Sequence, residues 1–117
     1  MVKKRLFLWL FLIWLSGANK LMAQRADAIL PKVPASRLRE DVILLKKILE
    51  ANHPSLYWYT PKDSMDQYFR YTINSITDSL NEVAFKNKVA WLVSKIRCGH
   101  TTVRFSKAYG KIAPLFR

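Results

Sequence analysis

The sequence is poor in cysteine, glycine and acidic residues, and each shortage excludes a class of protein. Cys98 is the only cysteine, so no disulfide can form within the chain. Three glycines among 117 residues leave no glycine-rich loop for phosphate binding and no glycine-flanked serine of the nucleophile-elbow type. The two histidines, His53 and His100, lack the spacing of metal ligands, so we expect no metal and no cofactor.

Basic residues outnumber acidic residues by 20 to 8, which gives the chain a net charge of +12. Such a balance could attract nucleic acid or anionic lipid. The basic residues are nevertheless scattered singly or in pairs such as Lys46-Lys47, which is typical of solvated helix faces. We therefore expect no nucleic-acid partner, and contact with a membrane only through the export signal described next.

Residues 1–23 have the three parts of a secretory signal peptide. Basic residues occupy positions 3–5, an unbroken apolar run follows, and small residues precede Ala23. The apolar run is too short to span a bilayer, which takes about 20 residues. Cleavage after Ala23 removes four basic residues and lowers the net charge from +12 to +8. We expect the chain to be exported to the periplasm or the extracellular space; the alternative is an uncleaved membrane anchor.

The remaining sequence predicts a mainly α fold, with a three-helix N-terminal bundle in residues 36–98. Residues 24–35 hold two prolines, show no periodicity and are expected to form a linker or an extended arm. Apolar residues then recur at helical spacing in three stretches. Their positions are Leu38, Val42, Leu45 and Leu49 in the first, Met65, Phe69, Thr72, Ile73, Ile76 and Leu80 in the second, and Phe85, Val89, Leu92 and Ile96 in the third.

Polar residues mark where these helices should begin and end. Ser36, Thr60 and Asn81 each precede an apolar stripe. At such a position a side-chain oxygen can accept a hydrogen bond from a free backbone N–H of the first turn. Pro54 should end the first helix near His53, because the residue before a proline avoids helical geometry. The ring of His53 is then expected to cap the last carbonyl groups of that helix.

The segment after the third helix predicts a short β-strand. Gly99 is placed to end the helix in a left-handed conformation. Residues 100–105 then alternate between two faces, which is the strand period. Because a single strand leaves its backbone groups unpaired, we expect residues 99–117 to hold this strand and the start of a following domain. The chain is thus expected to be a fragment of a larger α/β protein.

Two segments of the sequence, HPSLYWYT at 53–60 and LVSKIRCGHTTV at 92–103, carry a resemblance to a known family. With the signal and the helices, they resemble the N-terminal region of secreted tail-specific serine peptidases, the C-terminal processing peptidases and relatives of the tricorn core, especially Bacteroidetes-type forms. The resemblance covers about residues 38–109. Family members often have an acidic residue where this chain has Cys98. The resemblance implies peptide-bond hydrolysis by a serine that lies in a later α/β domain.

The resemblance assigns a role to His100 alone, as the general base of the complete protein. The tricorn-like branch uses a histidine at a turn that matches His100, whereas another branch uses a lysine. Neutral imidazole suits this task, because a serine hydroxyl is a poor nucleophile until a base takes its proton. A structural or solvent-exposed histidine beside Gly99 is the alternative.

Three adjacent aromatic residues, Tyr57, Trp58 and Tyr59, predict either a lid over the core or a rim that binds substrate. Cys98 is either a small buried apolar residue or a thiol activated by Arg97. We therefore expect the N-terminal region of an exported serine peptidase, inactive by itself, whose complete form acts on a peptide or protein. The alternative is a self-contained periplasmic helical module that binds a peptide or protein at the aromatic rim.

Overall fold

The computed structural model describes residues 30–112 and 114. The expected signal peptide at 1–23 lies outside the described residues, as does the first half of the expected linker, residues 24–29. The described part of the chain is mainly helical, which confirms the expected fold class. Among these residues, no helix combines the length and the apolar character that crossing a bilayer requires.

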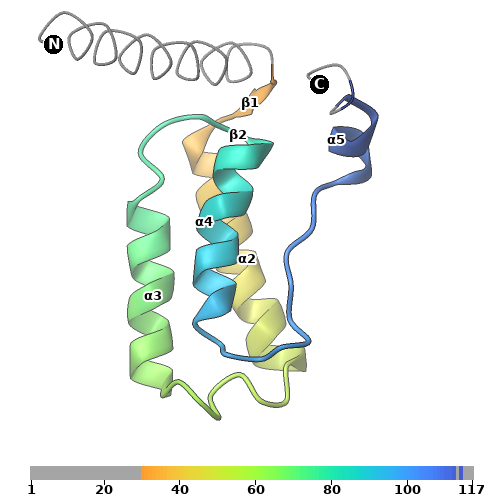
Figure 1. The fold of residues 1–117 in the computed structure, drawn as a ribbon. Coiled ribbons are helices and arrows are strands. Elements are labelled where there is room, and N and C mark those ends of the chain that lie inside the picture. The colour runs from red at the N-terminus through yellow and green to blue at the C-terminus, as the bar shows by residue number, and fades with distance from the viewer. Residues whose placement is uncertain (1–29, 113, 115–117) are drawn as a thin grey trace, which may run out of the picture. The chain divides into compact units, whose positions relative to one another are not determined.

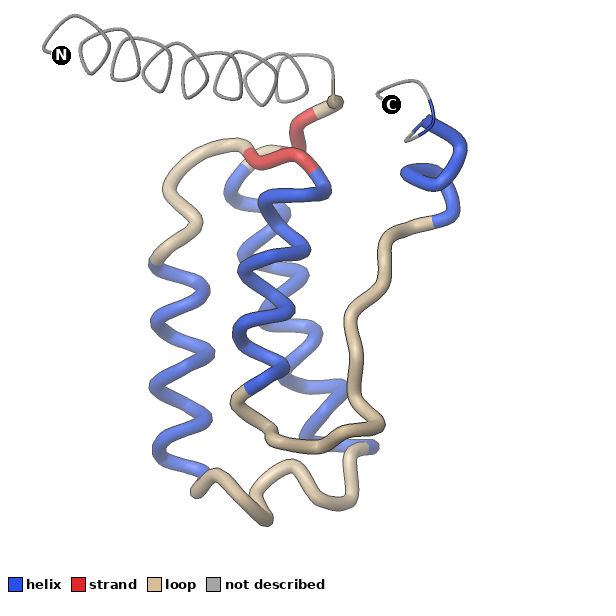
Figure 2. Tube along the Cα trace, in the orientation of Figure 1, coloured by secondary structure: helices blue, strands red, loops and turns tan. Residues whose placement is uncertain are grey.

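Three long helices, one short helix and a two-stranded sheet make up the described part (Figures 1 and 2). In chain order they are β1 (Lys32–Val33), α2 (Ala35–Asn52), α3 (Lys62–Asn74), β2 (Leu80–Asn81), α4 (Glu82–Ser94) and α5 (Lys107–Ile112). β1 pairs with β2 in antiparallel register, with Lys32 opposite Asn81. β1 falls within the expected linker, so the end of that segment belongs to the bundle.

The three long helices bury their apolar stripes in one core. α3 packs against both α2 and α4. Burial of such stripes, more than helix propensity, holds short helices together in water. The buried core residues are Leu38, Val42, Leu49, Leu56, Met65, Phe69, Ile76, Val89, Leu92, Val93 and Ile96. The predicted stripes supply most of this set, but the second stripe was wrongly carried through Leu80: α3 ends at Asn74, and Leu80 lies in β2.

One of the three expected helix caps forms. The side chain of Asn81 accepts a hydrogen bond from the backbone N–H of Ala84 at 2.9 Å, at the start of α4. The caps expected from Ser36 and Thr60 are absent, because α2 begins one residue before Ser36 and both helices start after a proline. Thr60 instead donates its hydroxyl to the carbonyl oxygen of Lys95. It therefore ties the turn before α3 to the end of α4.

The prediction that Gly99 ends the third helix in a left-handed conformation was wrong. α4 ends at Ser94, and the next three backbone N–H groups bond to carbonyl oxygens three residues earlier, which tightens the chain. Arg97, with φ of 59°, then takes the left-handed conformation. The reversal comes before Gly99 because Ile96 is fully buried and the chain must leave the core directly after it.

The strand predicted for residues 100–105 does not form; residues 101–106 have no regular secondary structure. The sequence alternation is still visible in the burial, because Thr101 and Val103 are half-buried and Thr102 and Arg104 are exposed. Val103 packs against the helical core. The segment lies with one side on the bundle, but within residues 30–112 no strand lies beside it to pair with its backbone.

The caps give a test of these helix boundaries. Asn81→Ala is expected to lower the free energy of unfolding by about 1 kcal/mol or more, because it removes the acceptor of the Ala84 N–H. Ser36→Ala is expected to change it by less than about 0.5 kcal/mol, since α2 has no side-chain cap. Urea unfolding of both variants measures the difference, and equal losses would contradict the boundaries described above.

Candidate functional site

Two turns that are far apart in the sequence lie at the same end of the bundle, the turn between α2 and α3 and the turn that follows α4 (Figure 1). A hydrogen bond of 2.7 Å joins Nε2 of His53 to the hydroxyl oxygen of Thr101. A second one runs from the hydroxyl of Thr60 to the carbonyl oxygen of Lys95. These two contacts fix the turns against one another, and they define the candidate site.

The sequence predicted that the ring of His53 caps the end of the first helix, and this prediction was wrong. Its backbone N–H closes α2 by bonding to the carbonyl oxygen of Leu49, and its ring turns to Thr101. The other ring nitrogen, Nδ1, is buried and has no hydrogen-bond partner among the described residues. The sequence holds one signal for this geometry: Pro54 forces His53 into extended backbone, which directs its ring away from the helix axis.

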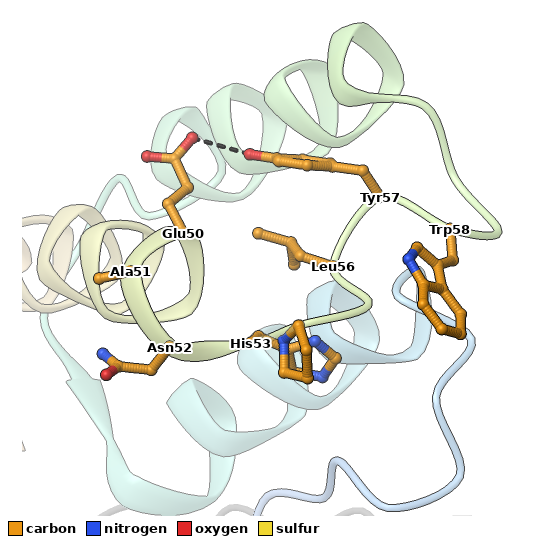
Figure 3. A pocket seen from close by; sticks show the side chains of 8 residues that line it. Glu50, Ala51, Asn52, His53, Leu56, Tyr57 and Trp58 are labelled. Atoms are coloured by element: carbon orange, nitrogen blue, oxygen red, sulfur yellow. Dashed lines mark hydrogen bonds between the residues drawn. The ribbon is translucent and has the colours of Figure 1, made fainter.

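A pocket of about 600 Å³ lies over the turn between α2 and α3 (Figure 3). Among its lining residues, Leu56 is buried, and the hydroxyl of Tyr57 donates a hydrogen bond of 2.8 Å to a carboxylate oxygen of Glu50. Trp58 stands at its edge and is 75% exposed. Tyr59, 61% exposed, is not among the residues that line the pocket.

The two interpretations of the aromatic segment therefore apply to different residues. Tyr57 is half-buried and packs against the core, as a lid would. Trp58 and Tyr59 are open to solvent, as a rim would be. Aromatic rings with this exposure offer a large apolar area for contact with a ligand. Of the two exposed aromatic residues, only Trp58 also lines the pocket.

Two lysines and two carboxylates form a network beside the pocket. The carboxylate of Asp66 lies 2.7 Å from the ammonium groups of both Lys46 and Lys62. These two hydrogen bonds, first that of Lys46, lower the pKa of Asp66 from 3.8 to about 2. Burial of the Tyr57 ring, followed by its hydrogen bond to Glu50, raises the pKa of Tyr57 to about 12. Tyr57 therefore stays a neutral hydrogen-bond donor at physiological pH.

His100 lies in the turn after α4 and is exposed. Within residues 30–112 its imidazole makes no hydrogen bond and no ion pair. No serine among the described residues bonds to it, so this part of the chain holds a candidate base without a nucleophile in contact. An exposed imidazole on a fixed turn is free to meet a group that approaches from outside the bundle.

Cys98 is half-buried beside His100 and packs against the core, so it fills the role of a small apolar residue in part. Its thiol also faces hydrogen-bond donors. The backbone N–H of His100, and next the hydroxyl of Thr101, lower the pKa of Cys98 below its usual value. The groups that lower this pKa are thus His100 and Thr101, and not Arg97, the neighbour that the sequence suggested.

Thr101 is the residue that the sequence analysis missed. Its hydroxyl meets His53 from one side and the thiol of Cys98 from the other. The pattern offered no signal for it, because Thr101 and His53 are 48 residues apart. In the described residues, no group of three or more histidine, cysteine, aspartate or glutamate side chains could hold a metal ion.

Comparisons of this chain with protein-family models, with curated proteins and with solved structures gave no match. No role can therefore be transferred to it from a relative or from a structural neighbour.

The pKa of Asp66 predicts a loss of stability in acid. Because this pKa lies at about 2 in the folded chain and near 3.8 when unfolded, the unfolded chain binds more protons in between. The stabilisation is present above pH 3.8 and is lost as pH falls towards 2. Melting temperatures measured from neutral pH downwards are expected to fall less in Asp66→Asn than in wild type.

Asp78→Asn is the control, since Asp78 forms no ion pair among the described residues and is exposed. It should follow the wild-type curve. If Asp66→Asn loses stability in acid as steeply as wild type does, the Lys46 and Lys62 contacts do not hold this carboxylate.

Proposed function

We propose that this chain is the N-terminal helical region of an exported serine peptidase of the tail-specific type. One observation carries the proposal: the hydrogen bond between His53 and Thr101 joins the two segments on which the resemblance rests. These segments, 53–60 and 92–103, are far apart in the sequence and meet at one end of the bundle (Figure 2).

His100 is the catalytic base in this proposal. In the complete enzyme its neutral imidazole takes the proton of the serine hydroxyl as the oxygen attacks the peptide carbonyl carbon, and then gives that proton to the leaving amine. The imidazole is exposed, so a serine from another domain can reach it. The bundle supplies the base, and the later domain supplies the nucleophile and the groups that stabilise the oxyanion.

Neighbouring contacts hold the backbone of His100 in place. On its N-terminal side, Ile96 is fully buried and Arg97 takes the left-handed conformation that turns the chain. On its C-terminal side, Thr101 is bonded to His53. A base must lie within hydrogen-bond reach of the proton that it removes, so a turn fixed on both sides suits this task. Thr101 and His53 are positioning residues in this scheme.

The test uses the complete product encoded by the gene, including any frame that continues beyond Arg117. This product is expected to hydrolyse unfolded peptides and to react with a fluorophosphonate reagent for active serines. His100→Ala should lower its kcat by about 10²- to 10⁴-fold, the usual share of a general base. The 117-residue chain alone should do neither.

Tyr71→Ala is the control for this experiment, because Tyr71 lies on α3, is exposed and takes no part in the turn contacts. It should leave kcat unchanged. A complete product that keeps full kcat in His100→Ala would overturn the role of His100. A complete product without a reactive serine would overturn the peptidase itself.

The exposure of Trp58 favours a second candidate, a binding module for peptides or proteins. Its ring borders the 600 Å³ pocket and is 75% exposed, as an anchor for a partner would be. This function needs no serine, and the described bundle has its own core. It is therefore a function that the chain could perform without a catalytic domain.

Calorimetric titration of the chain with a pool of unstructured peptides tests this candidate. Trp58→Ala is expected to weaken binding by about 30-fold, the loss that an aromatic anchor typically causes. Trp91→Phe is the matched control, because Trp91 lies on α4 and does not line the pocket. No binding by wild type, or an equal loss in both variants, would exclude a peptide site at Trp58.

A further inference from the structure

The outer face of α2 exposes apolar side chains. Ile43 is 44% exposed and Leu44 is 55% exposed, at the middle of a helix whose opposite stripe is buried in the core. Ile48, one turn further on, is 49% exposed. Covering such an exposed apolar group with another surface removes it from water, which is favourable.

Charges of opposite sign flank this apolar pair at equal distances. Glu40 lies about one turn before the Ile43-Leu44 pair and Lys47 about one turn after it, on the same face, since residues three or four apart are neighbours on a helix. Neither charge forms an ion pair among the described residues. Small residues, Ser36 and Ala51, stand at the two ends of the face, where they permit close approach.

We propose that this face, made of Ser36, Glu40, Ile43, Leu44, Lys47 and Ala51, binds a second copy of the chain with the two α2 helices antiparallel. A two-fold axis at the Ile43-Leu44 peptide bond brings Ile43 against the partner's Ile43 and Leu44 against the partner's Leu44. It also places Glu40 opposite the partner's Lys47, and Lys47 opposite the partner's Glu40. The contact is isologous, as in most homodimers.

The charge pattern selects both the occupant and its direction. In a parallel pair, Glu40 would face the partner's Glu40 and Lys47 the partner's Lys47, and like charges in contact oppose association. In the antiparallel pair both contacts become attractive. A self-complementary arrangement of this kind fits a copy of the same helix. Because only two large apolar side chains per copy are central, affinity in roughly the micromolar range is expected.

Sedimentation equilibrium of the chain at increasing concentration tests the proposal. Wild type is expected to pass from monomer to dimer. Glu40→Lys and Lys47→Glu should each weaken the dimer by about tenfold or more, because each makes two like-charge contacts across the axis. The double variant Glu40→Lys/Lys47→Glu restores both pairs with reversed signs, so it should dimerise like wild type. This recovery separates pairing from any effect on folding.

Leu44→Glu should abolish the dimer, whereas Tyr71→Glu, on the exposed face of α3, should leave it unchanged. Circular dichroism checks that each variant keeps the helical content of wild type. A chain that stays monomeric at every concentration would overturn the proposal. So would a dimer that resists both Leu44→Glu and the single charge reversals, or a double variant that fails to recover.

Discussion

Burial of one apolar core between α2, α3 and α4 is the constraint on which the other features depend. Met65, Phe69 and Ile96 lie at its centre with almost no exposed surface. Ile96 is the last of these residues in the chain, and it determines where the backbone leaves the core. The turn after α4 therefore emerges beside the turn between α2 and α3. The polar contacts between the two turns are possible only because the apolar stripes have already fixed the helices.

The sequence predicted well those features that a repeating pattern encodes. Helical periodicity identified the three stripes, because an apolar residue on the wrong face of a helix would leave the core. It predicted poorly where a choice depends on the rest of the fold. Gly99 was expected at the left-handed position, but the burial of Ile96 moved the reversal to Arg97. The alternation of residue types in 100–105 predicted which side of the segment faces the bundle. It could not predict whether a partner strand is present to pair with the segment.

The candidate site was predictable only in part, for the same reason. Trp58 and Tyr59 are exposed, as a rim requires, and the run of adjacent aromatic residues in the sequence predicted this rim. The contact of His53 with Thr101 spans 48 residues, and no local pattern encodes it. Thr60 has the sequence of a cap, yet Pro61 takes the position before α3, and the Thr60 hydroxyl donates to the carbonyl oxygen of Lys95 instead. Long-range pairing decides such cases.

The attachment of the chain beyond Ile96 has a consequence for motion. No residue from 97 to 112 is fully buried; besides the packing of Cys98 and Val103 against the core, two polar contacts hold the segment. One is the bond between Thr101 and His53; the other is the carboxylate of Glu82, which accepts hydrogen bonds from the backbone N–H and the hydroxyl of Ser106. Releasing both leaves the helical core intact, so amide protons of this segment exchange through a subglobal opening, at a lower free energy than those of α2, α3 and α4.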